Sequence, residues 1–326
     1  MRSKSRLFEE HTIPTEGNET LFAKLLMPRL PIQPQRVVFF APLVGAGAGQ
    51  QLLNVRSFSR RGAIVISYEY RGHPKSTGMF DLDCTIVDTH YALIWALEYA
   101  RELGLPLHGF AMCYGAIPLL AQFKRGGYGR FMRSVSTISG LYHLNQILRV
   151  EDFAPIVSRH IGREIDAPSL LEEIAGGVLD CDGLGFKQAL QEYLSKLMPD
   201  LRVELDYFEE LKYERVNKRQ ALLQFCQSDY LDGVEVPPWM PCTAYIGHQD
   251  ELLYAGGPAD PESYKDYVLS VVPHASVLEF EMDHYGRGPD RDTVVQCVGD
   301  AFERFDTSPV PPRHVDNFTH QQAVLR

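Results

Sequence analysis

The chain has 326 residues, of which 45% are hydrophobic and 23% charged, and its formal net charge is −10. This composition is typical of a globular protein with a sizeable core. No run of five or more like charges occurs, so the sequence favours neither a nucleic-acid partner nor a basic membrane-binding patch. No apolar stretch follows the basic residues at the start, and no apolar run reaches about 18 residues. We therefore expect a cytoplasmic protein with no membrane partner.

Six cysteines are scattered along the chain without a Cys-x-x-Cys pair or the His/Cys spacing of a zinc site. We therefore expect no disulfide framework, no metal and no cofactor. Most of the cysteines are expected to be small buried hydrophobic side chains, since free cysteine is among the most buried residue types. The six are Cys84, Cys113, Cys181, Cys226, Cys242 and Cys297.

Extended and helical patterns alternate through the first half of the chain. Two extended stretches near the start, 9–14 and 21–27, are separated by a turn-like segment and predict an antiparallel pair. Short continuous apolar runs then indicate strands that are buried on both faces. The predicted strands are 36–41, 63–68, 107–112 and 134–140, and the predicted helices between them are 50–61, 83–103 and 116–123.

The second half interrupts this alternation before resuming it. Residues 141–239 contain several helical patterns and no convincing buried strand, whereas 242–247 and 276–280 again predict strands. Helices between successive strands imply a mainly parallel sheet. The predicted architecture is therefore an α/β fold, a mainly parallel twisted sheet flanked by helices with an inserted helical cap. Its core comprises 1–140 and 240–306, its cap 141–239, and its proline-containing tail 307–326 is expected to be flexible.

One cysteine has surroundings that indicate catalysis. Ala111-Met112-Cys113-Tyr114-Gly115 lies between a predicted strand and a predicted helix and has the small-x-nucleophile-x-small form of a nucleophile elbow. Small residues are needed there because the turn is tight, and the helix N-terminus beneath it favours a thiolate. A structural cysteine in a turn that leads into a helix is the alternative interpretation.

The residues downstream favour the catalytic interpretation. A hydrolase with such an elbow needs an acid and then a histidine, each at the carboxyl end of a later strand. Asp250 follows the strand predicted at 242–247, and His284 follows the one at 276–280. His284 would take the Cys113 proton or hold a thiolate, and Asp250 would fix the imidazole tautomer. His248 is too near a strand end, and His274 precedes the last strand.

Negative charge on the reacting carbonyl oxygen needs two backbone N–H donors. One is expected from Tyr114, directly after the nucleophile. The other is expected from the loop after the strand at 36–41, where Val44 is the first candidate and Leu43 the second.

The order Cys113, Asp250, His284 resembles the α/β-hydrolase superfamily over roughly 36–305. Residues 70–76 resemble the loop after the family's fourth strand, although Pro74 stands where glycine is usual. The segment 15–19 and the overall layout are similar to the myristoyl-acyl-carrier thioesterases of bacterial bioluminescence, which use serine. A cysteine elbow resembles the aminoacyltransferases that shuttle residues between carrier proteins in nonribosomal peptide synthesis, and also dienelactone hydrolases.

This resemblance implies an enzyme that processes acyl thioesters through an acyl-Cys113 intermediate. The activity expected is that of an acyltransferase or thioesterase in natural-product (secondary metabolite) biosynthesis, acting on acyl or aminoacyl groups bound to a carrier protein or coenzyme A. Transfer from a pantetheine thioester to Cys113 exchanges one thioester for another, which keeps the acyl group available for transfer. An acyl-carrier or peptidyl-carrier protein bearing phosphopantetheine is then the expected partner, with a small-molecule acyl acceptor as a further one.

Two other functions stay open at this point. One is a dienelactone-type or other ester hydrolase, and the other is a non-catalytic binding module on a hydrolase scaffold, with Cys113 as inert filler. Basic residues of the cap, such as Lys187 and Lys196, would dock an acidic carrier protein or would lie on ordinary solvated helix faces.

Overall fold

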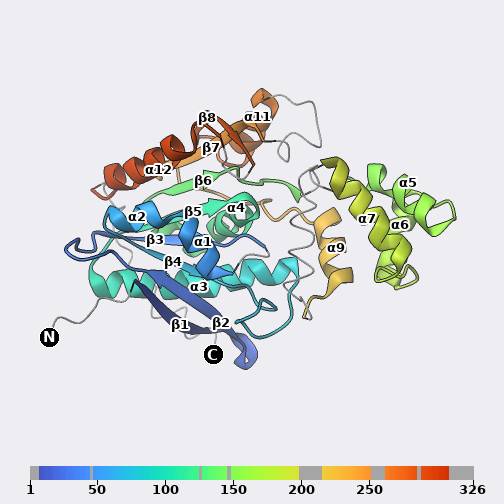
Figure 1. Ribbon diagram of the computed structural model, residues 1–326, viewed down its shortest axis with the longest axis horizontal. Helices are drawn as coiled ribbons and strands as arrows, with labels where there is room; N and C mark the ends of the chain where they lie inside the picture. Colours follow the sequence, from blue (N-terminus) through green and yellow to red (C-terminus); the bar gives the residue numbers. More distant parts are fainter. Residues whose placement is uncertain are drawn as a thin grey trace.

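The computed structural model describes residues 7–44, 47–124, 127–144, 148–197, 215–250, 261–284 and 288–307. Within these residues one eight-stranded sheet runs through the molecule in the order β1-β2-β4-β3-β5-β6-β7-β8 (Figure 1). The pairs β1–β2 and β2–β4 are antiparallel and all the others are parallel, so the predicted mainly parallel sheet is confirmed. The strands are β1 Phe8–Pro14, β2 Thr20–Leu26, β3 Arg36–Ala41, β4 Ala63–Tyr68, β5 Leu107–Met112, β6 Val135–Ile138, β7 Cys242–Gln249 and β8 Ser276–Asp283.

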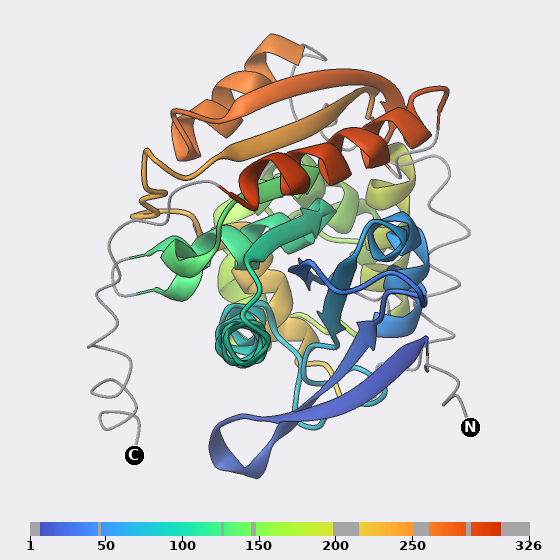
Figure 2. The same cartoon turned by 90° about the vertical axis from the view of Figure 1, so that its left-hand side faces the viewer.

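Helices cover both faces of the sheet, and each face has its own hydrophobic cluster. Every residue of β3 and β4 is buried, which is why these strands read as continuous apolar runs in the sequence. The β1–β2 hairpin and the strand β8 lie at opposite edges (Figure 2). One face carries α3 Leu82–Leu103, α4 Ala116–Leu120 and α11 Pro261–Val271, and the other carries α1 Ala48–Asn54, α2 Arg56–Arg60 and α12 Arg291–Phe305.

The long helix α3 has clear start and stop signals. Asp81 is its N-cap and accepts a hydrogen bond from the Cys84 backbone N–H at 2.8 Å. Gly104 ends it with φ 68°, the left-handed conformation that glycine adopts without steric cost. The buried side of α3 faces the sheet and includes Ala92, Leu93 and Ala96. This helix therefore closes one face of the core beneath β3 and β5.

The interval 141–239 was predicted to be an inserted helical cap. Four helices are described in it, namely α5 Val150–Ile161, α6 Ala167–Gly176, α7 Leu184–Leu197 and α9 Lys218–Gln227. Helices α5, α6 and α7 lie to one side of the sheet (Figure 1), whereas Leu141, Leu231 and Val236 belong to the core cluster of the sheet. A hydrophobic cluster centred on Phe153, Val157 and Leu170 packs these helices against one another. Phe225 of α9 contacts both this cluster and the core. Gln224, also on α9, accepts a hydrogen bond from the first N–H of α3 at 2.8 Å.

Most predicted elements match the structure, and the exceptions have local causes. β3, β4 and β5 begin and end at the predicted residues. The single helix predicted at 50–61 is wrong, because Val55 (φ −109°, ψ 21°) separates two short helices, α1 and α2. β6 is shorter than predicted, because Ser139 has φ 46°. All of the predicted tail except its first residue lies outside the described residues.

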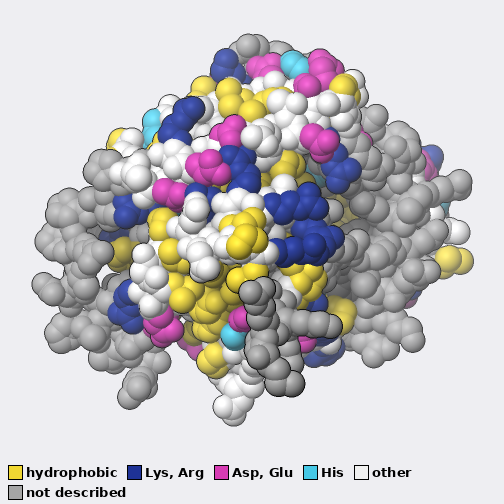
Figure 3. All heavy atoms as spheres, turned by 60° about the vertical axis from the view of Figure 1, so that its left-hand side comes forward, with side chains coloured by type: hydrophobic (Ala, Val, Ile, Leu, Met, Phe, Trp, Pro, Cys, Tyr) yellow, Lys and Arg dark blue, Asp and Glu magenta, His cyan; other side chains and the backbone are white. Residues whose placement is uncertain are grey.

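The surface shown in Figure 3 carries Lys and Arg side chains among Asp and Glu side chains and hydrophobic ones. Both signs of charge on one face agree with the mixed charge of the sequence. In the part of the chain that the structure describes, we find no helix whose length and apolar character would let it cross a membrane.

Candidate active site

Strand β5 ends in a sharp turn that carries Cys113. This residue has φ 48°, in the left-handed region that residues other than glycine rarely adopt. α4 begins three residues later at Ala116. A Cβ on Gly115 would clash with the Ala41 carbonyl oxygen and would lie 3.0 Å from that of Pro42. The predicted strand, turn and helix are therefore present, and the need for a small residue at position 115 has a steric cause.

Three side chains from three strand ends meet at this turn. Asp250 directly follows β7 and His284 directly follows β8. Because β5 to β8 are parallel, both residues lie at the same ends of the strands as Cys113. Nε2 of His284 lies 2.9 Å from Sγ of Cys113, and Nδ1 of His284 lies 2.9 Å from Oδ1 of Asp250. The structure thus brings together the residues predicted as nucleophile, base and acid.

The surroundings of His284 favour its charged form. Burial by itself lowers the pKa of the imidazole, but the negative charges of Cys113 and Asp250 and the hydrogen bonds to both raise it, and the net pKa lies well above the usual value. Asp250 is fully buried and His284 nearly so, whereas Cys113 is partly exposed. The nucleophile residue is thus partly accessible while its base and acid are shielded. Such an arrangement is able to hold a thiolate–imidazolium pair.

The rival histidines are occupied elsewhere. Nε2 of His248 lies 3.3 Å from a carboxylate oxygen of Glu279 on the neighbouring strand. Nε2 of His274 lies 3.1 Å from the backbone carbonyl oxygen of Met240. Neither contact involves Cys113, in agreement with the sequence argument against both.

The candidate oxyanion donors differ in what they already bind. The Tyr114 N–H lies in the first turn of a helix, where backbone N–H groups have no acceptor within the helix. The hydroxyl of Tyr114 anchors its side chain on α3, 2.7 Å from Oγ1 of Thr85. The Leu43 N–H donates to Oε1 of Gln51 at 3.1 Å. Among the described residues no acceptor is found for the Val44 N–H.

Glu69 is a buried carboxylate that the sequence argument missed. One of its oxygens accepts a hydrogen bond from the Ala48 N–H at the start of α1 (3.2 Å), and the other accepts one from the Lys75 N–H (3.0 Å). It therefore ties the loop after β4 to the loop after β3. Its position at the end of a fully buried strand was the available signal, because a charge buried there needs partners.

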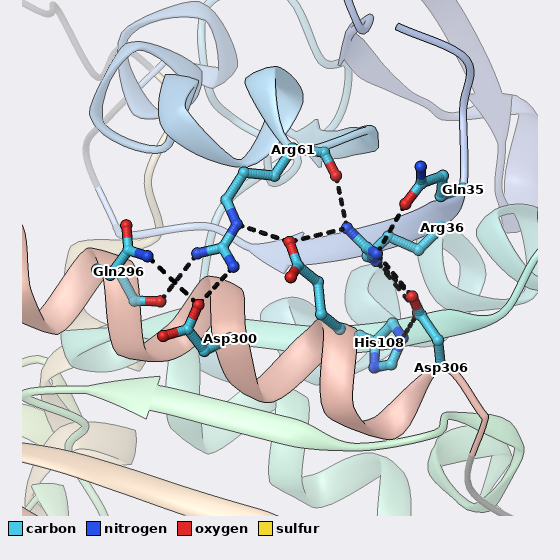
Figure 4. Close-up of polar contacts among 8 residues, drawn as sticks. Gln35, Arg36, Arg61, His108, Gln296, Asp300 and Asp306 are labelled. Atoms are coloured by element: carbon cyan, nitrogen blue, oxygen red, sulfur yellow. Dashed lines mark hydrogen bonds and ion pairs between the residues drawn. The ribbon is translucent and has the colours of Figure 1, made fainter.

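A second His–Asp pair lies near the start of β5, at the end of the strand opposite to Cys113. Figure 4 shows its contacts, in which His108 is fully buried and Asp306 is partly exposed. Nε2 of His108 lies 3.1 Å from Oδ1 of Asp306, and Nδ1 of His108 lies 2.8 Å from Oγ of Ser134. Arg36 also binds Asp306, with its Nη2 2.6 Å from Oδ2. Ser134 and His108 are almost completely buried, so the hydroxyl and the imidazole are shielded from substrate, while Asp306 is partly exposed. Among the described residues, no group of three or more His, Cys, Asp or Glu side chains is placed to hold a metal ion.

No family model matches the chain, and no curated protein sequence is significantly similar to it. Solved structures do resemble it. A carboxyl esterase from Bacillus coagulans, in complex with glycerol, aligns with a TM-score of 0.59 at 15% identity over 93% of this chain and 100% of that chain. A soluble variant of monoglyceride lipase from Saccharomyces cerevisiae, in complex with a substrate analog, has a TM-score of 0.57 at 13% identity over 94% and 98%. An esterase from Pyrococcus furiosus has a TM-score of 0.54 at 14% identity over 92% and 91%.

At these levels of identity the likeness establishes the fold alone. The chain has the α/β-hydrolase fold, as the sequence predicted. The three structures named are of two esterases and a lipase.

Proposed function

We propose that this chain is an ester hydrolase that works through a covalent acyl-Cys113 intermediate. One observation carries the proposal: the His284 imidazole lies 2.9 Å from both the Cys113 sulfur and the Asp250 carboxylate. That is the geometry in which a histidine activates a nucleophile while an acid holds its tautomer. The similarity in fold to esterases and a lipase supports hydrolysis of an ester.

The first half-reaction is acylation of Cys113. The thiolate attacks the ester carbonyl carbon, a C–S bond forms, and the carbonyl π electrons move to oxygen. Two backbone N–H groups, of Tyr114 and of the loop after β3, stabilise this oxyanion. The intermediate collapses as the C–O bond breaks, and Nε2 of His284 gives its proton to the departing alkoxide. Asp250 stabilises the charged imidazole before this transfer and fixes the neutral tautomer after it.

The second half-reaction is hydrolysis of the acyl-cysteine. Neutral His284 takes a proton from water, the hydroxide oxygen attacks the thioester carbonyl carbon, and the C–S bond breaks to release the carboxylic acid. The sulfur leaves as a thiolate beside the recharged imidazole, which restores the starting pair. The acid product loses its proton to solvent, so protons and charge balance over the cycle.

A second candidate is acyl transfer from a carrier-bound or coenzyme A thioester, and the sulfur of Cys113 favours it. A thioester intermediate is captured readily by thiols and amines. The charge on the cap opposes an acidic carrier, because carboxylates outnumber basic side chains in the described residues 148–197. Ester hydrolysis therefore remains the main proposal.

Mass spectrometry of the purified chain tests both candidates. After brief exposure to a p-nitrophenyl ester or an acyl-pantetheine thioester, we expect an acyl adduct on Cys113. If water discharges the adduct as fast as added thiols or amines do, the chain is a hydrolase; much faster loss to an acceptor would establish a transferase. A chain that forms no adduct with any acyl donor is not an acyl-transferring enzyme.

Alkylation of Cys113 separates an enzyme from a binding module. Iodoacetamide at neutral pH should label Cys113 faster than the other five cysteines, because Cys113 is the one that lies beside a charged imidazole among the residues described. His284→Ala should slow this labelling about tenfold or more. His248→Ala is the matched control on the neighbouring strand and should leave the rate unchanged. Equal, slow labelling of all accessible cysteines would contradict the proposal.

A further inference from the structure

The peptide unit between Pro42 and Leu43 is held from both sides. The hydroxyl of Tyr70 donates to the Pro42 carbonyl oxygen at 2.9 Å, and Oε1 of Gln51 accepts from the Leu43 N–H at 3.1 Å. These two backbone groups belong to one planar unit and point in opposite directions. Tyr70 and Gln51 therefore fix the orientation of this peptide plane.

The two residues that hold this peptide are buried and come from separate elements. Tyr70 follows β4 and is fully buried, and its ring lies edge-on to those of Tyr68 (5.5 Å) and Tyr114 (6.5 Å). Gln51 lies on α1 and is 1% exposed. Because water does not compete at these positions, both hydrogen bonds keep their geometry more firmly than exposed ones.

The clamped peptide borders the turn that carries Cys113. The Pro42 carbonyl oxygen would be 3.0 Å from a Cβ on Gly115, two residues after the nucleophile. The next peptide unit along the loop carries the Val44 N–H. Because the Pro42–Leu43 peptide plane is fixed, the Leu43–Val44 peptide plane can change its orientation only through the two backbone dihedral angles of Leu43.

We propose that Tyr70 and Gln51 are positioning residues that commit the Leu43 N–H to Gln51 and leave the Val44 N–H, with that of Tyr114, to bind the oxyanion. This assignment rests on the proposed function. It chooses between Val44 and Leu43, which the sequence left as first and second candidates. A donor must be oriented before charge develops, and a displacement of about 1 Å can cost a hundredfold in rate.

Two conservative variants test this clamp. Tyr70→Phe removes the donor to Pro42, and Gln51→Met removes the acceptor for Leu43 with little change in volume. Each should lower kcat for a p-nitrophenyl ester by about tenfold to a hundredfold and leave KM within about twofold, because the oxyanion forms after substrate binds. The double variant should lose little more than the worse single variant, since both side chains act on one peptide.

A matched control identifies losses that come from folding alone. Gln122→Met removes a buried amide that bonds the Ile86 and Pro118 carbonyls and does not touch the clamped peptide. It should lower the unfolding temperature and leave kcat unchanged. If it lowers kcat as much as the test variants do, the clamp is merely structural.

Other outcomes overturn the inference in distinct ways. A rise in kcat for Gln51→Met would mean that Gln51 competes with the oxyanion, which makes Leu43 the donor. An unchanged kcat in both test variants, with an acyl-Cys113 adduct still formed by the parent chain, would reject the clamp and leave the proposed function intact. Absence of any adduct in the parent chain would reject both.

Discussion

Two His–Asp pairs lie beyond opposite ends of strand β5, and only one of them is arranged for chemistry. Strand β5 links them, since His108 lies at its start and Cys113 directly follows its end. Beyond the carboxyl end of β5, His284 bridges Cys113 and Asp250. Near the start of β5, His108 bridges Ser134 and Asp306. Both are chains of a hydroxyl or thiol, an imidazole and a carboxylate. Such a chain is therefore insufficient as a criterion for an active site.

Charge balance and access distinguish the two pairs. The pKa of His284 is raised well above its usual value, because Cys113 and Asp250 outweigh the cost of burial. The pKa of His108 is lowered, because burial dominates and the positive charge of Arg36 opposes the pull of Asp306. Burial, helped by Arg36, thus favours the neutral form of His108 beside a carboxylate that is already paired with Arg36. Burial of Ser134 completes the difference by shielding its hydroxyl from substrate.

Substitution of the two nucleophile-like residues gives the largest expected contrast. Cys113→Ala should reduce ester hydrolysis at least about ten-thousandfold, because the acyl intermediate is no longer possible. Ser134→Ala should leave kcat and KM unchanged and cost about 1 kcal/mol of unfolding free energy through its lost hydrogen bond to His108. Ester assays and urea unfolding on both variants measure this. An equal loss of activity in both variants would contradict the assignment of a catalytic role to Cys113 and a structural role to Ser134.

Substitution of the two carboxylates should separate rate from stability. Asp250→Asn should lower kcat about a thousandfold or more, since the imidazole loses its orienting acid. It should also lower the pKa of His284, so that the alkaline fall in kcat/KM moves to lower pH.

Asp306→Asn is the matched variant in the second pair. It should cost about 2–3 kcal/mol of unfolding free energy, because Arg36 is left buried without its carboxylate, and should leave kcat unchanged. Urea unfolding and pH–rate profiles on both variants provide the readouts. A thousandfold loss of rate in Asp306→Asn would contradict the assignment.

The sequence predicted the residues around Cys113 better than the contacts between His108 and Asp306. β3, β4 and β5 were placed to the residue because buried strands form continuous apolar runs between turn signals. The strand order and the elbow then locate Cys113, Asp250 and His284. The break between α1 and α2 was not predicted, because Val55 carries no glycine or proline signal.

The contacts that were missed depend on tertiary packing. His108 and Asp306 are 198 residues apart in the chain, and no motif connects them. The contacts of Tyr70 and Gln51 with one peptide unit likewise depend on how β4 and α1 pack beside the loop after β3. Sequence patterns indicate which strand ends face one another, but they do not reveal which backbone groups the neighbouring side chains engage.

The smallest predicted effect is the pH dependence of stability at the His108–Asp306 pair. The pKa of His108 is lowered by burial in the folded state, so the unfolded chain binds a proton more readily below the ordinary histidine pKa of about 6.5. The stabilisation from neutral His108 is therefore present above that pH and is lost as the pH falls toward the folded pKa.

In urea unfolding at several pH values, His108→Gln should weaken the fall in unfolding free energy below about pH 6.5. His248→Gln, at an exposed histidine, serves as the control. An unchanged pH dependence in His108→Gln would show that His108 is not held neutral, and the proposed difference between the two His–Asp pairs would fail.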